Sequence, residues 1–217
     1  MVNLDLDESG EDAALTSDGA TLALCTGKRV RNKTKAAETT GRGDSYVHLF
    51  DVARELRQSQ SICTLERSKE GARVEVNRAS FSPDGVYLAI ARSDNSVHVY
   101  DARYMGRNVV HRYRHARPPA FEEQNHFGVV QLEWVHSTTR SAYNLLSGGE
   151  DGCVRMWTPG WTDSGNGRAI AKIDTDVGAF SVGDRNVGER DLVVGGSDGS
   201  VTVFDGLRDF IKVENDY

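Results

Sequence analysis

The sequence predicts an all-β fold built from four copies of one structural unit, and three observations support this. The 217 residues include 22 glycines but only 4 prolines, which favours many tight turns between short strands over long helices. Hydrophobic residues make up 38% and charged residues 27%, a composition typical of globular chains. The third observation is an internal repeat.

Four segments align without gaps: GDSYVHLFD at 43–51, SDNSVHVYD at 93–101, EDGCVRMWT at 150–158 and SDGSVTVFD at 197–205. In each, an Asp is followed by apolar residues at the third and fifth positions and by an aromatic residue at the sixth. Alternation such as that of Val97 with Val99 has the period of a β-strand. The repeated positions are Asp44, Asp94, Asp151 and Asp198, with the aromatics Phe50, Tyr100, Trp157 and Phe204.

A second apolar strand precedes each of these segments, at 22–27, 88–93, 144–149 and 192–197. Asp-Gly, Asp-Asn or Asp-Ser pairs between the two strands are typical of tight hairpin turns, since Gly and Asn tolerate positive φ. A further strand comes before each pair, and the connecting stretches 54–71 and 104–126 are expected to hold outer strands. The spacing of roughly 50 residues between copies fits a four-stranded unit.

The S-x-D-x-x-V-x-V-aromatic-Asp ending and the SPDG-x-x-LA hairpin resemble the repeats of the WD40 family over residues 11–206. This resemblance implies a β-propeller of four-stranded antiparallel blades, at about 11–53, 72–103, 127–159 and 169–206. An acidic flank, 1–10, precedes them, and 207–217 is a C-terminal flank or the start of a further strand. Only one copy has a Trp and none has a clear Gly-His pair, so we expect the family's Asp–His–Ser/Thr–Trp hydrogen-bond network to be incomplete.

Propellers have 4–8 blades, and seven is common in the family that this chain resembles. Since four blades are readable, we expect them to form part of a larger ring or to be completed by a partner. Isolated, the chain is expected to be unstable or to self-associate, because its end blades would leave apolar faces in water.

Net charge, cysteine content and the lengths of apolar runs limit the kinds of partner and the cellular location that we expect. The net charge of −6 argues against nucleic acid as a partner, because phosphate binding requires clustered basic residues. Three separated cysteines, Cys25, Cys63 and Cys153, favour neither disulfides nor a metal site. No apolar run approaches a membrane span of ~20 residues, and the start of the chain lacks a signal-peptide pattern. We therefore expect no membrane association and a cytoplasmic or nuclear location.

No catalytic, cofactor-binding or metal site is predicted. Common enzyme motifs are missing, and His126, His136 and Glu133 lack a further metal ligand at useful spacing. The repeated Asp and aromatic residues are expected to make the fold. The resemblance implies a non-catalytic scaffold that binds a protein or peptide through the loops connecting its blades. The alternative is a propeller hydrolase or lyase, in which acidic and His residues would converge on the central channel.

Two features suggest a more specific role. The segment KRVRNKTKAAE at 28–38 is predicted to be either a solvated loop or a site for nuclear import or an acidic partner; its basic residues are Lys28, Arg29, Arg31, Lys33 and Lys35. The sequence Tyr100-Asp101-Ala102-Arg103 resembles the W-D-x-R box with which some WD40 proteins dock on the adaptor of a cullin-type ubiquitin ligase. That resemblance implies that Arg103, after Asp101, is the contact residue.

Overall fold

The computed structural model describes residues 8–27, 44–52, 61–68, 74–106, 109–116, 127–137, 143–159, 167–184 and 187–206. Within them the strands form four separate antiparallel sheets, three with four strands and one with three. Each sheet follows chain order from its inner to its outer strand. This arrangement confirms the predicted all-β fold of propeller blades.

The strands of the first blade are β1 (Ser9–Leu15), β2 (Thr21–Gly27), β3 (Ser45–Asp51) and β4 (Ser61–Thr64). The second has β5 (Val76–Phe81), β6 (Tyr87–Arg92), β7 (Ser96–Asp101) and β8 (His111–Arg114). The third has β9 (Val129–His136), β10 (Tyr143–Gly149), β11 (Cys153–Trp157) and β12 (Arg168–Lys172). In the fourth, β13 (Val177–Val182), β14 (Leu192–Gly196) and β15 (Val201–Phe204) are described.

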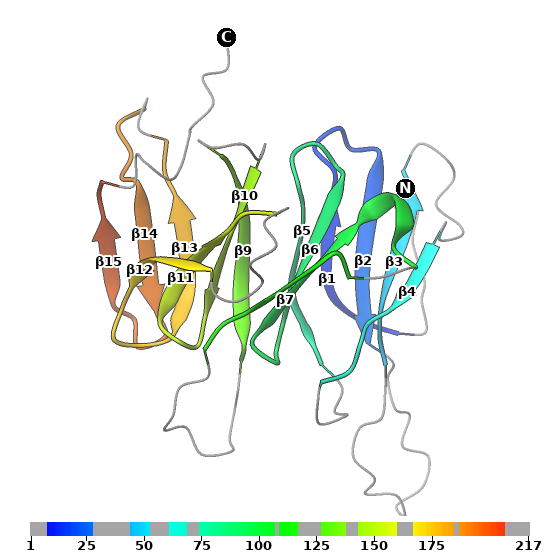
Figure 1. The fold of residues 1–217 in the computed structure, drawn as a ribbon, viewed down its shortest axis with the longest axis horizontal. Helices are drawn as coiled ribbons and strands as arrows, with labels where there is room; N and C mark the ends of the chain where they lie inside the picture. Colours follow the sequence, from blue (N-terminus) through cyan, green and yellow to red (C-terminus); the bar gives the residue numbers. More distant parts are fainter. Residues whose placement is uncertain are drawn as a thin grey trace, which may run out of the picture.

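The four blades stand side by side in chain order (Figure 1). The first and the last lie at opposite ends of the row, so neither has a neighbouring blade on its outer side. The outer strands β4 and β8 lie within the two stretches where outer strands were expected. Among the described residues, Ala102–Tyr104 forms a 3-10 turn, and no helix is long and apolar enough to cross a membrane.

The hairpin turns that follow the repeat Asp residues have the predicted positive φ. Asn95 has φ 63°, Gly152 has φ 70° and Gly199 has φ 85°, each directly after the Asp of its repeat. The Asp side chain stabilises the turn by accepting backbone N–H bonds: Asp198 Oδ1 accepts from the N–H of Ser200 at 2.9 Å. An Asp followed by Gly or Asn thus fixes where each blade reverses direction.

The hydrophobic core lies between the blades and is divided into three clusters, one for each pair of neighbours. We call the side of a blade that contacts the next blade its forward face, and the side that contacts the preceding blade its rear face. Forward-face residues such as Val47, Val97 and Val154 pack against rear-face residues of the following blade. The rear-face residues that they meet include Leu88 and Ile90, then Leu145 and Trp157, then Leu192 and Val194.

The register of each inner strand shifts at one residue near its start, which is a β-bulge repeated in all four blades. Side chains next to the bulge tie inner strands together. Asp12 accepts a 2.6 Å bond from the N–H of Ala79, and Gln131 makes two bonds to the backbone of Phe180. These bonds fix the relative height of neighbouring blades.

Candidate interaction surfaces

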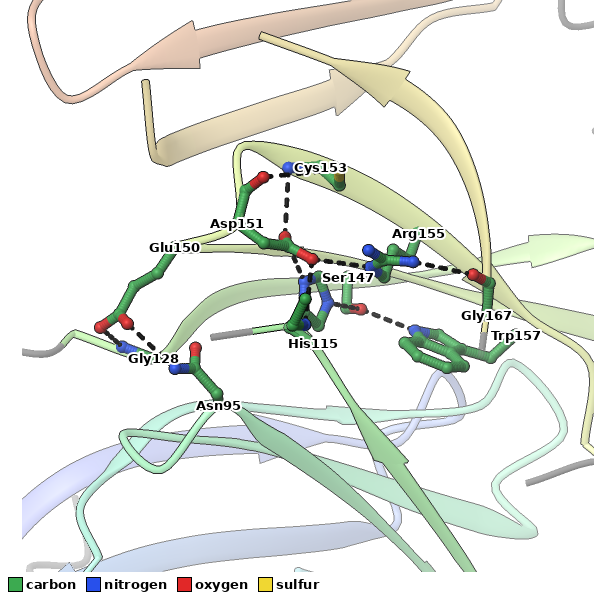
Figure 2. A network of polar contacts seen from close by, with 11 residues as sticks. Asn95, His115, Gly128, Ser147, Glu150, Asp151, Cys153, Arg155, Trp157 and Gly167 are labelled. Atoms are coloured by element: carbon green, nitrogen blue, oxygen red, sulfur yellow. Dashed lines mark hydrogen bonds and ion pairs between the residues drawn. The ribbon is translucent and has the colours of Figure 1, made fainter. Parts of the chain in front are cut away.

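Four hydrogen-bonded side chains connect the end of the second blade to the third blade (Figure 2). Trp157 Nε1 lies 2.7 Å from Ser147 Oγ, and Ser147 Oγ lies 2.7 Å from His115 Nε2. His115 Nδ1 in turn lies 2.8 Å from Asp151 Oδ1. Because an indole N–H can only donate, the serine hydroxyl accepts from Trp157. The two ring nitrogens of His115 then join this hydroxyl to the carboxylate of Asp151.

This network corrects the expectation that the Asp–His–Ser/Thr–Trp set would be incomplete. The histidine is His115, which follows β8 directly and is preceded by Arg114 where the family pattern has Gly. A search for a Gly-His pair passes over it. The signal that could have found it is its place at the end of an outer strand, shortly before the copy that carries Ser147 and Trp157.

The carboxylate of Asp151 has several partners. Burial alone would raise its pKa, but the hydrogen bond from His115 and the ion pair with Arg155, at 2.8 Å, outweigh burial and lower the pKa to about 2. Arg155 also donates to the carbonyl of Gly167 at 3.0 Å, which links the turn to the start of β12. Asp151 therefore holds the turn, the outer strand of the preceding blade and its own β-strand together.

The second and fourth blades have apolar side chains at the positions of this polar network. His115, Leu65 and Ile173 occupy one repeat position, because the N–H of each donates to the carbonyl of the residue after the repeat Asp. By the same alignment, Ser147 corresponds to Ile90 in the second blade and Val194 in the fourth. Between the first and second blades the matching side chains are Leu65, Ile90 and Tyr100, which are all buried. Between the third and fourth they are Ile173 and Val194, which are buried, and Phe204, which is partly buried.

The second blade also buries an arginine beside its repeat Asp. Arg92 has a side chain only 1% exposed, and it donates to both carboxylate oxygens of Asp94, at 3.2 and 3.1 Å. It also donates to the carbonyl of Glu66 and to Nδ1 of His98. Burial and then the nearby Arg92 lower the pKa of His98 to about 3, so its imidazole is neutral. This buried cluster connects Asp94, His98 and the carbonyl of Glu66 through Arg92, and its role is structural.

The remaining repeat residues are also placed within the blades. Asp44 forms an ion pair with Arg67 at 2.6 Å, and Asp198 accepts backbone bonds in its turn. In the first blade, His48 lies 2.9 Å from the carboxylate of Glu8. The repeat aromatics Phe50, Tyr100 and Trp157 are almost fully buried, and Phe204 is partly buried. Each of these positions has a local structural partner.

The second and third blades are also joined at the end of the sheets where the repeat turns lie. Glu150 accepts a bond from Asn95 Nδ2 at 2.9 Å and another from the N–H of Gly128 at 2.5 Å (Figure 2). Gly128 has φ 70°, and a Cβ there would lie 2.3 Å from the carbonyl oxygen of Arg92. Only glycine fits this close approach between two blades.

At the opposite end, the predicted docking residues are brought together. Arg103 makes a bidentate pair with Asp101, with Nε to Oδ1 at 2.9 Å and Nη2 to Oδ2 at 2.7 Å, and its side chain is 64% exposed. That hydrogen bond raises the pKa of Arg103. Tyr87 lies opposite Asp101 in the β6–β7 ladder. Arg103 Cζ lies 5.7 Å from the centre of the Tyr104 ring.

Aromatic and apolar side chains lie beside Arg103 in the chain and on the strands near it. Tyr104 is 55% and Val110 46% exposed. Tyr87 stacks on Trp134 of the third blade with centroids 6.3 Å apart, and it also contacts His111. We call this surface the rim patch; its members are Tyr87, Arg103, Tyr104, Val110, His111 and Trp134. Sequence reasoning identified Arg103 but missed the others, because their exposure depends on how blades two and three meet.

Some of the other residues considered in the sequence analysis lie outside the described residues, and the rest lie within them. The basic residues at 28–38 and His126 lie outside the described residues. His136 makes an edge contact with Tyr143, and burial raises the pKa of Glu133, which faces the fourth blade near Val182. Across the described stretches, no group of three or more His, Cys, Asp or Glu side chains could hold a metal ion. The three cysteines are buried and free.

Comparisons with known proteins agree with this architecture. Residues 60–101 and 122–158 match the family model described as WD domain, G-beta repeat. The structure is similar to a solved structure described as the Dos1 propeller, with a TM-score of 0.66 and 14% sequence identity, over 93% of this chain and 42% of that one. The chain thus spans less than half the length of that protein. No curated protein matches the sequence.

Proposed function

Because its repeats place this chain in the WD40 β-propeller family, whose members are typically non-catalytic and bind other proteins, we propose that it is an interaction scaffold that binds a protein through the rim patch. The observation that carries this proposal is the exposure of Tyr104 beside an arginine whose position is already fixed. Tyr and Arg are the residue types enriched among those that dominate binding energy in protein interfaces.

The rim patch has the properties of a preorganised binding surface. Asp101 holds the Arg103 fork in a single geometry, so less side-chain entropy is lost when a partner binds. The rings of Trp134 and His111 are half-buried and both pack against the half-buried ring of Tyr87. These packed rings are a rigid part of the patch, whereas Tyr104 and Val110 are its exposed part. A partner that covers this surface gains apolar contacts and a charge-assisted bond together.

One experiment tests the patch as a whole. A tagged chain carrying Tyr104→Ala and Val110→Ser is compared by quantitative affinity purification with the wild type and with Phe127→Ala. Phe127 is also an exposed apolar residue, but it lies at the opposite end of the blades. We expect bound proteins to be lost, about tenfold or more, only from the rim variant. Equal losses from both variants, or from neither, would contradict the proposal.

The exposure of Arg103 at the end of β7 also favours a second candidate, docking on the adaptor of a cullin-type ubiquitin ligase. The test is calorimetric titration of the purified adaptor into wild-type chain, Arg103→Ala and the control Arg112→Ala. Arg112 is a similarly exposed arginine in an ion pair with Glu66. Binding that depends on Arg103 but not on Arg112 supports this partner. An absence of binding to the wild type excludes it.

A further inference from the structure

The forward face of the fourth blade is exposed at positions that every other blade buries. Val201 occupies the repeat position of Val47, Val97 and Val154, which are all 0% exposed, yet Val201 is 69% exposed. Val203 occupies the position of Leu49 and Val99, and it is exposed as well. These side chains have the chemistry of an inter-blade contact and have no blade against them.

The rear face of the first blade shows the complementary deficit. Leu15 is 54% exposed, whereas Phe81, at the same position of the second blade, is 8% exposed. Leu22 and Leu24 are only partly buried, although their counterparts Leu88 and Ile90 are fully buried. The chain therefore presents one unpaired forward face and one unpaired rear face.

In all three interfaces within the chain, a forward face packs on the rear face of the next blade. The surface that fits the fourth blade is therefore a rear face of this same repeat, and the first blade carries one. We propose that two copies of this chain associate head to tail, with the fourth blade of each copy packed on the first blade of the other.

The expected register follows from the ties between inner strands. Asp12 and Gln131 each bond to the inner strand of the next blade, at Ala79 and Phe180 respectively. In the fourth blade the matching residue is Ala179, and the matching recipient in the first blade is Ala13; both are exposed. Two small side chains can approach each other closely there, although Ala179 cannot supply the acceptor that Asp12 and Gln131 offer to the backbone N–H of the next blade.

A second copy would cover both unpaired faces. The same contact, between a fourth blade and a first blade, would form twice in the dimer. Four blades from each copy give eight, which lies within the 4–8 blades of closed propellers. Head-to-tail contacts form a closed assembly when the rotation between copies closes, and an open filament when it does not. Closure of this ring would bury the exposed valines of β15 and would leave no blade face of either copy unpaired.

Light scattering coupled to gel filtration tests the assembly. We expect the wild type to have the mass of two chains, and Val201→Glu and Leu15→Glu each to have the mass of one. Mixed together, these two variants should recover a two-chain species, because each retains the face that the other lacks. Val187→Glu changes an exposed valine in the loop between β13 and β14, and this control should leave the dimer intact.

A crosslink keeps the proposal testable if a charged variant fails to fold. The double variant Ala13→Cys/Ala179→Cys should form an intermolecular disulfide under mild oxidation, and neither single variant should. A wild type that is monomeric at all concentrations overturns the proposal. It is also overturned if Val201→Glu alone dissociates the dimer and Leu15→Glu does not, because a contact between two fourth blades would then be responsible.

Discussion

His115 and Trp157 hydrogen-bond the same hydroxyl group, that of Ser147, and each does so at 2.7 Å. One side chain belongs to the end of β8 in the second blade and the other to β11 in the third. The hydroxyl of Ser147 therefore joins two blades as well as two strands, although it is one of the smallest polar groups in the core.

Removal of that hydroxyl should destabilise the protein measurably. In Ser147→Ala, the indole N–H of Trp157 and Nε2 of His115 both lose their partner in a buried site, so we expect the free energy of unfolding to fall by about 1–3 kcal/mol. Urea denaturation measures the change. Thr64→Val removes a hydroxyl from an exposed strand position and should change it by less than about 0.5 kcal/mol. Similar values for the two variants would argue against the network.

Stability should also depend on the charge of Asp151. Its pKa in the folded protein is about 2, below the ordinary value of 3.8, so the ionised form is stabilised by folding. That contribution is fully present above the ordinary pKa and disappears as the pH falls through about 2. We expect Asp151→Asn to cost about 2 kcal/mol at pH 7. In urea denaturation series, the gap to wild type should narrow from pH 5 to pH 2; a constant gap would contradict this.

The repeat pattern was sufficient to predict the fold because its signals are local. Alternation such as that of Val97 and Val99 identifies a strand, and an Asp before Asn95 or Gly152 identifies a turn. The hydrogen-bond network could not be predicted in the same way. His115 is separated from Asp151 by 36 residues, and only the packing of the second blade against the third brings them together.

The solvent exposure of the repeat residues could not be predicted from the sequence either. Val97 and Val201 are the same residue type at the same repeat position, yet one is fully buried and the other largely exposed. What differs is the presence of a neighbouring blade, which no local pattern encodes. For the same reason the motif around Arg103 could be recognised, but its neighbour Val110 could not be assigned to a surface.

The contact between the second and third blades should be sensitive to Gly128. In Gly128→Ala, the positive φ is strained and the new Cβ would lie 2.3 Å from the carbonyl oxygen of Arg92. We expect a loss of about 1–3 kcal/mol, measured by thermal and urea unfolding. Gly106→Ala is the matched control, since nothing lies within 4 Å of a Cβ there. A Gly128→Ala protein as stable as this control would show that the two blades adjust freely.

The basic segment at 28–38 gives a prediction about location. If it supports nuclear import, replacement of its five basic residues with Ala should move a fluorescently tagged chain out of the nucleus. The residues are Lys28, Arg29, Arg31, Lys33 and Lys35. Replacement of Arg103 and Arg112 with Ala serves as a control for loss of positive charge. An unchanged distribution would assign the segment no role in import.

The last prediction follows from the two solutions that the blades use at one set of positions. The first and second blades meet at Leu65, Ile90 and Tyr100, which occupy the positions of His115, Ser147 and Trp157 between the second and third blades. Both sets are buried. Ser147→Ile alone puts an apolar side chain beside an imidazole and an indole N–H that still need partners, which should cost more than about 2 kcal/mol.

The triple variant His115→Leu/Ser147→Ile/Trp157→Tyr removes the polar groups together and copies the contact between the first and second blades. Replacement of all partners by apolar groups of fitting shape can be nearly neutral, so we expect it to cost clearly less than the sum of the three single substitutions. Asp151 would retain its ion pair with Arg155. Urea denaturation of the three single variants and the triple gives the coupling energy. A triple variant that costs the full sum would show that the two sets are not interchangeable.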